Sequence, residues 1–61
     1  MESFFNSHKS LAYNLSNQYE IDIETSKEYL KQLIHCYLYL NPQVDFKEFF
    51  ELMTDIFISL I

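Results

Sequence analysis

DFKEFFELMTDIFISLI, residues 45–61, is the stretch that decides the fold of this 61-residue chain. Asp45 and Glu48 have the spacing of a capping box, in which side-chain oxygens accept free N–H groups at the start of a helix. After this start, apolar residues recur every three or four positions, which is the period of one helix face. The residues of this apolar stripe are Phe46, Phe49, Phe50, Met53, Phe57 and Leu60. The stretch therefore predicts an amphipathic helix that begins after Asp45.

This helix is predicted to carry more apolar surface than one core can cover. Its polar side is formed by Lys47, Glu48, Glu51, Thr54 and Asp55. Four further apolar residues fall outside the stripe, namely Leu52, Ile56, Ile58 and Ile61. Towards the C-terminus the helix is therefore apolar almost all round, and such a helix is usually buried on more than one side.

A second helix is predicted from Thr25 to Leu40 or Asn41. Thr25 and Glu28 fit a capping box, and Pro42 stops the helix because the residue before a proline avoids the helical conformation. The core stripe of this helix consists of Leu30, Leu33, Ile34, Tyr37 and Leu40. Its second half adds Cys36, Leu38 and Tyr39, which make it apolar nearly all round. We expect Cys36 to fill space in the core.

A first helix is predicted from about Ser3 to Asn17, with Asn17 in the left-handed conformation that commonly ends helices. Its apolar side consists of Phe4, Phe5, Leu11, Ala12, Leu15 and Tyr19. Residues 19–24 alternate apolar and acidic side chains, which alone is a strand pattern. Because a single strand has no partner here, we expect an extended connection with Ile21 and Ile23 turned inward.

The predicted fold is all-α, with residues 1–61 as a single small domain of three short helices. The second and third helices form an antiparallel hairpin, because short loops favour antiparallel neighbours. A chain this short buries only about 60% of its unfolded surface, and one cysteine allows no internal disulfide. We therefore expect dimerisation to complete a helical bundle. The predicted self-association or partner interface is Leu38, Tyr39, Leu52, Ile56, Ile58 and Ile61.

Charge and composition exclude several classes of partner. Four lysines, no arginine and nine acidic residues give a net charge of −5, which is a poor match for nucleic acid or an anionic membrane. We expect no signal peptide and no membrane span. A lone thiol favours a reducing compartment, so we expect a cytoplasmic protein. The bias towards Asn, Lys, Ile, Phe and Tyr is typical of AT-rich genomes and suggests a low-GC bacterium or its phage.

Two motifs are candidates for a catalytic or a metal-binding site. His35 and Cys36 are a possible base and nucleophile, but adjacent helix residues point about 100° apart, so they do not reach each other. Residues 44–49 resemble the exit from an EF-hand loop. Aligned on Glu48, however, the first two calcium-ligand positions fall on Tyr37 and Tyr39, which lack the carboxylate or amide oxygens that calcium requires. We therefore expect no metal, no cofactor and no enzymatic activity.

The remaining features favour a protein–protein interaction module. The excess of apolar residues predicts a small regulator or inhibitor that docks on another protein and on a second copy of itself, as a homodimer. The alternative is an acidic mimic of DNA that blocks a DNA-binding protein. In that case Glu48, Glu51 and Asp55 form the acidic surface that faces the partner.

The protein itself should not bind duplex DNA at physiological salt. With no arginine and a net charge of −5, the counterion release that drives such binding is missing. Fluorescence anisotropy of a labelled duplex measures this directly. Micromolar binding that weakens with salt would contradict the prediction and the DNA-mimic alternative together.

Overall fold

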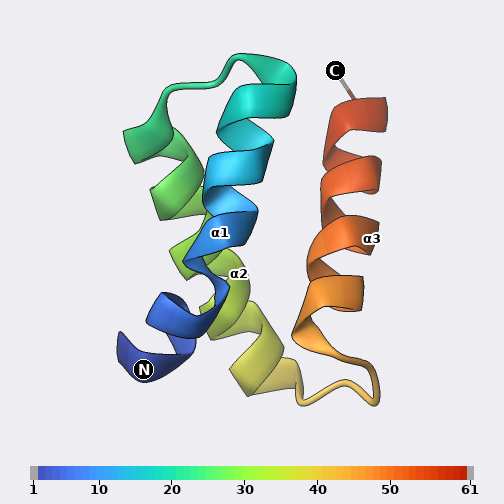
Figure 1. The fold of residues 1–61 in the computed structure, drawn as a ribbon. Coiled ribbons are helices and arrows are strands. Elements are labelled where there is room, and N and C mark those ends of the chain that lie inside the picture. Colours follow the sequence, from blue (N-terminus) through green and yellow to red (C-terminus); the bar gives the residue numbers. More distant parts are fainter. Residues whose placement is uncertain (1, 61) are drawn as a thin grey trace.

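The computed structural model describes residues 2–60, which form three helices, α1 (Glu2–Tyr19), α2 (Ile23–Leu40) and α3 (Phe46–Ser59). The chain runs up through α1, down through α2 and up through α3, so that neighbouring helices are antiparallel (Figure 1). The all-α prediction is confirmed, and so is the antiparallel hairpin of the second and third helices. Within residues 2–60 the alternating segment 19–24 forms no strand.

The connection between α1 and α2 differs from the prediction. Asn17 does not end α1, which continues to Tyr19, and Glu20 takes the left-handed conformation with φ of 55°. The N–H of Ile21 donates to the carbonyl of Ser16 at 3.2 Å, as in the Schellman ending of a helix. The Ser16 hydroxyl donates to the carbonyl of Ile21 at 2.5 Å. These two bonds turn Ile21 towards the core, where it is half-buried.

The start of α2 also differs from the prediction. Asp22, and not Thr25, is the N-cap, and its carboxylate accepts the N–H groups of Glu24 at 3.1 Å and Thr25 at 3.3 Å. The helix therefore begins at Ile23, in the segment that was expected to be extended. The predicted end is confirmed, because Asn41 is left-handed, with φ of 49°, directly before Pro42.

The start of α3 lies at the predicted residue but is held differently. Asp45 is the N-cap through its backbone, and its carbonyl accepts the N–H of Phe49 at 2.9 Å. Its side chain makes no capping hydrogen bond, so this part of the capping-box prediction is wrong. The loop before α3 is fixed from α2 instead, because the Tyr37 hydroxyl donates to the carbonyl of Val44 at 2.6 Å.

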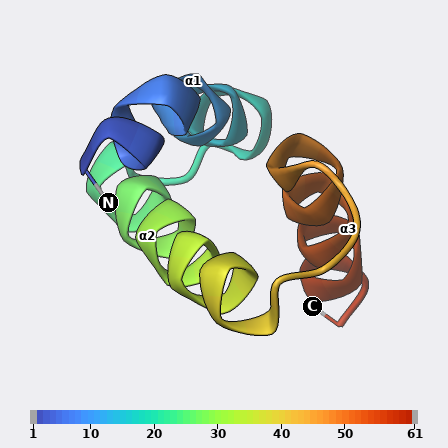
Figure 2. The same ribbon diagram turned by 90° about the horizontal axis from the view of Figure 1, so that it is seen from below.

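The core joins all three helices, but unevenly. Its buried hydrophobic residues are Ala12, Leu15, Leu30, Leu33, Ile34, Phe46, Phe49 and Phe50. α2 packs far more extensively on α1 than on α3. Ala12 and Ser26 are both 0% exposed, and their small side chains let α1 and α2 approach closely. Viewed along the bundle, α1 lies across one side of the α2–α3 pair and no described helix covers the other side (Figure 2).

An aromatic cluster around Phe46 attaches α3 to the other two helices. The Phe46 ring is 3% exposed, and its centroid lies 5.3 Å from those of Phe4 on α1 and Tyr37 on α2. The His8 ring lies 5.0 Å from it. The buried first turn of α3 therefore contacts both neighbouring helices.

Four residues assigned to an apolar helix side by periodicity are exposed, and one assigned to a polar side is buried. Tyr19 is exposed at the end of α1. Leu40, Phe57 and Leu60 are exposed because the ends of α2 and α3 are not covered by a third helix. Thr54 is buried, and its hydroxyl is satisfied by the Tyr29 hydroxyl at 3.1 Å. The apolar stripe of α3 is thus rotated towards Thr54 relative to the prediction.

Tyr37→Phe should lower the free energy of unfolding by about 1 kcal/mol, because the Val44 carbonyl loses its hydroxyl partner. Tyr39→Phe is the matched control, since Tyr39 is 88% exposed and its hydroxyl is free to bond to water. Urea unfolding followed by circular dichroism measures both. Equal stability of the two variants would show that the Tyr37 bond does not hold the loop.

Candidate functional site

The most prominent surface feature of the molecule is its exposed apolar side chains. Eight hydrophobic residues are buried, yet nine large ones are exposed in residues 3–60, so the outside holds as many as the core. The exposed residues are Tyr13, Tyr19, Leu38, Tyr39, Leu40, Leu52, Ile56, Phe57 and Leu60. Most of them lie on α2 and α3. No described helix covers these two helices on the side remote from α1.

Three of these residues form a row along α3. Leu52, Ile56 and Leu60 are spaced by four residues, so they lie one above another on the helix surface. The row is turned away from Phe50 and Thr54, which line the groove between α1 and α3. It lies beside Phe49, and the centroid of the Phe49 ring is 5.4 Å from that of Tyr37 on α2. It therefore belongs to the side of α3 that adjoins α2 and is remote from α1.

α2 contributes two residues to the same side. Cys36 and Leu40 follow Tyr29 by seven and eleven residues and so share its side of the helix, and Tyr29 stacks on Phe57 of α3. Both are exposed. The expectation that Cys36 fills space in the core is wrong, because Cys36 is exposed two helical turns beyond the level at which Tyr29 meets Phe57. We call Cys36, Leu40, Leu52, Ile56 and Leu60 the α2–α3 face.

The structure brings only part of the predicted interface together. Leu52 and Ile56 lie on the α2–α3 face, but Leu38 shares the side of Lys31, whose ammonium lies over the Phe5 ring of α1. Tyr39 points away from both neighbouring helices. Ile58 is half-buried, and Ile61 lies outside the described residues. Leu40 and Leu60 are missing from the prediction because periodicity assigns them to the core stripes, and Cys36 is missing because it is expected to fill space in the core.

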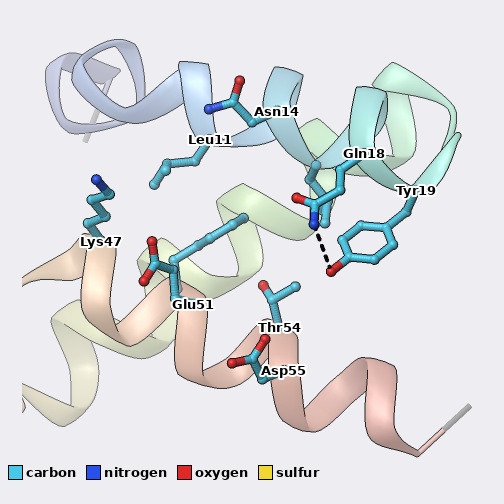
Figure 3. A pocket seen from close by; sticks show the side chains of 10 residues that line it. Leu11, Asn14, Gln18, Tyr19, Lys47, Glu51, Thr54 and Asp55 are labelled. Carbon is cyan, nitrogen blue, oxygen red and sulfur yellow. Dashed lines mark hydrogen bonds between the residues drawn. The ribbon is translucent and has the colours of Figure 1, made fainter.

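A groove of about 440 Å³ separates α1 from α3. Figure 3 shows Leu11 and Asn14 on the α1 side, with Lys47, Glu51 and Asp55 along α3 on the opposite side. The groove also contains Leu15, Gln18, Tyr19, Phe50 and Thr54. Its lining is therefore partly apolar, with amides on one rim and charges on the other.

The predicted acidic surface is exposed and borders this groove. Glu51 and Asp55 line it one helical turn apart, and Lys47 lies one turn before Glu51. Glu48 is exposed but does not line the groove. It precedes Leu52 by one turn and so borders the α2–α3 face.

A smaller apolar cavity of about 140 Å³ lies near the C-terminal end of α3. Its lining residues include Leu15, Ile21, Tyr29, Phe57 and Ile58. The cavity is the size of one large apolar side chain. Ile58, predicted to be part of an interface, lines this cavity instead and is half-buried.

The described residues form no cluster of metal-ligating side chains. Across residues 2–60, no three metal-ligating side chains of His, Cys, Asp or Glu come together. His35 and Cys36 are both exposed on the surface of α2. None of α1, α2 and α3 has the length and apolar character needed to cross a lipid bilayer.

The geometry of this site consists of an uncovered apolar face, a groove with an acidic rim and a small apolar cavity. Comparisons with known proteins find no relative that shares this arrangement. No protein-family model, no curated protein and no solved structure matches this chain.

Proposed function

We propose that this protein is a small, non-enzymatic interaction module that acts by docking on another protein, as a regulator or inhibitor in the cytoplasm. The observation that carries the proposal is the number of large apolar side chains left in water, which is nine among residues 3–60 against eight buried hydrophobic residues there. Contiguous apolar surface on a soluble protein is typical of an interaction site.

The energetics support the same proposal. Each large apolar side chain that becomes fully buried contributes about 1.5–3 kcal/mol. The whole stability of a natural domain is about 5–15 kcal/mol, and a chain this small belongs at or below the lower end. Most of the exposed side chains are already about half buried, so docking that covers several of them contributes a free energy comparable with the stability of the fold before the cost of association is subtracted.

The outer side of α2 suits this role. Tyr39 is 88% exposed and points away from α1 and α3, so it is available to a partner. Tyrosine is enriched among the residues that dominate binding energy, because its large rigid ring is ordered at low entropic cost. We therefore assign Tyr39 to the surface that meets the partner protein.

A second candidate function is mimicry of the DNA phosphate backbone. Glu48, Glu51 and Asp55 are all exposed on α3 at spacings of three and four residues, with Glu51 and Asp55 at the rim of the α1–α3 groove and Glu48 beside them. A row of this kind can occupy the basic site of a DNA-binding protein. Lys47, on the same side of α3, reduces its net charge.

The two functions are separated by comparing two variants as bait in extracts of the source cell. Tyr39→Ala should weaken capture of the partner by roughly tenfold or more if docking is apolar, since a tyrosine anchor is removed. The combined variant Glu48→Gln, Glu51→Gln and Asp55→Asn should then change capture little at physiological salt, because charges at a rim mainly affect the association rate.

The reverse result, with capture lost in the charge variant and kept in Tyr39→Ala, would establish mimicry instead. Circular dichroism checks that both variants fold, and both sites are exposed, so neither change removes a core contact. A partner captured equally by wild type and both variants would contradict both candidate functions.

A further inference from the structure

We propose that the α2–α3 face is the interface of a two-fold dimer, so that its occupant is a second copy of this chain. This inference rests on the proposed function in one respect, since it assigns one of the docking surfaces to the protein itself. The face consists of Cys36, Leu40, Leu52, Ile56 and Leu60, all of which are exposed. Leu60 is the most exposed of the four leucine and isoleucine residues, at 83%.

The charge distribution favours a second copy as the occupant. Each chain carries a net charge of −5, so two copies repel each other unless they meet through an uncharged surface. None of the five residues of the α2–α3 face is charged. Glu51, Asp55 and Lys47 line the α1–α3 groove on another side of α3, and Glu48 lies only at the border of the face. An apolar centre with a polar border is the ordinary composition of an interface.

The row on α3 is also arranged for self-pairing. Ile56 lies midway between Leu52 and Leu60, and the row is about 12 Å long at 1.5 Å per residue. A two-fold axis beside Ile56 places Leu52 of each copy against Leu60 of the other, so each residue of the row meets a member of the same row. This reciprocity is what a symmetric dimer interface requires.

The size of the molecule is sufficient for such an interface. A standard-size interface buries about 800 Å² on each partner, and the Cα trace extends over 29 × 25 × 14 Å. The accessible surface is 4619 Å², against roughly 4,200 Å² for a compact monomer of this mass. The chain thus carries more surface than a self-contained monomer, in keeping with a face that a second copy covers.

Sedimentation equilibrium of the full chain over a range of micromolar concentrations tests the dimer. Wild type should show a monomer–dimer equilibrium, and Ile56→Asp should raise the dimer Kd by roughly 30-fold or more. Leu38→Asp is the matched control, because Leu38 and Ile56 are 52% and 54% exposed but Leu38 lies outside the α2–α3 face. Leu60→Asp provides a second variant, since so exposed a side chain adds little to the fold of one chain.

The thiol of Cys36 gives an independent readout of the face. Its rate of modification by a maleimide should fall as wild-type concentration rises through the dimer Kd, and should stay constant in Leu60→Asp. Monomeric wild type throughout the range would overturn the proposal, as would a dimer that Leu38→Asp weakens as much as Ile56→Asp. So would a dimer whose Cys36 reacts at the monomer rate. Each result is independent of partner capture through Tyr39, so failure of the dimer and failure of the proposed function remain distinguishable.

Discussion

Burial of Phe46 is the constraint on which the arrangement of the three helices depends. Its ring meets Phe4 and His8 of α1 and Tyr37 of α2, and it is the first residue of α3. Phe46 therefore fixes both the start of α3 and the two helices against which α3 packs. Because α1 and α2 already pack closely on each other, the Phe46 cluster is the main attachment of the third helix at its N-terminal end.

This attachment has a consequence for the other end and the outer side of α3. The Tyr29 ring reaches Phe50 and Phe57, and its hydroxyl satisfies Thr54, but among residues 2–60 no helix covers the outer side of α3. Leu52, Ile56 and Leu60 remain in water as a result. Within residues 2–60 no fourth helix lies against this side, so the α2–α3 face stays open. The uneven packing of the three helices, close between α1 and α2 and limited between α2 and α3, thus underlies both the open α2–α3 face and the proposed role in binding.

The sequence predicts those features that depend on local signals. Asn41 and Pro42 end α2 where expected, and Asp45 marks the start of α3, because these residues restrict their own backbone. The predicted start of α2 is misplaced, since Asp22 and Thr25 are both good N-cap residues and it is the Asp22 carboxylate that accepts the N–H groups of Glu24 and Thr25. The burial of individual residues on α2 and α3 is predicted less well. Periodicity predicts which side of a helix is apolar, but it does not predict the tilt between two helices, which determines how much of that side is covered. That tilt exposes Cys36, Leu40 and Leu60 and buries Thr54, whose hydroxyl partner Tyr29 lies 25 residues away. The α2–α3 face is therefore only partly predictable: Leu52 and Ile56 are exposed as expected, whereas Cys36, Leu40 and Leu60 were expected to be buried.

The central claim is that one copy of this chain leaves apolar surface that a second copy covers. The melting temperature of the wild-type chain, measured by circular dichroism across a wide range of protein concentration, tests it most directly. A fold that is coupled to association gains stability by mass action, so the account predicts a melting temperature that rises with concentration. A cooperative transition at the same temperature at every concentration would show that the monomer is self-sufficient and would contradict the account.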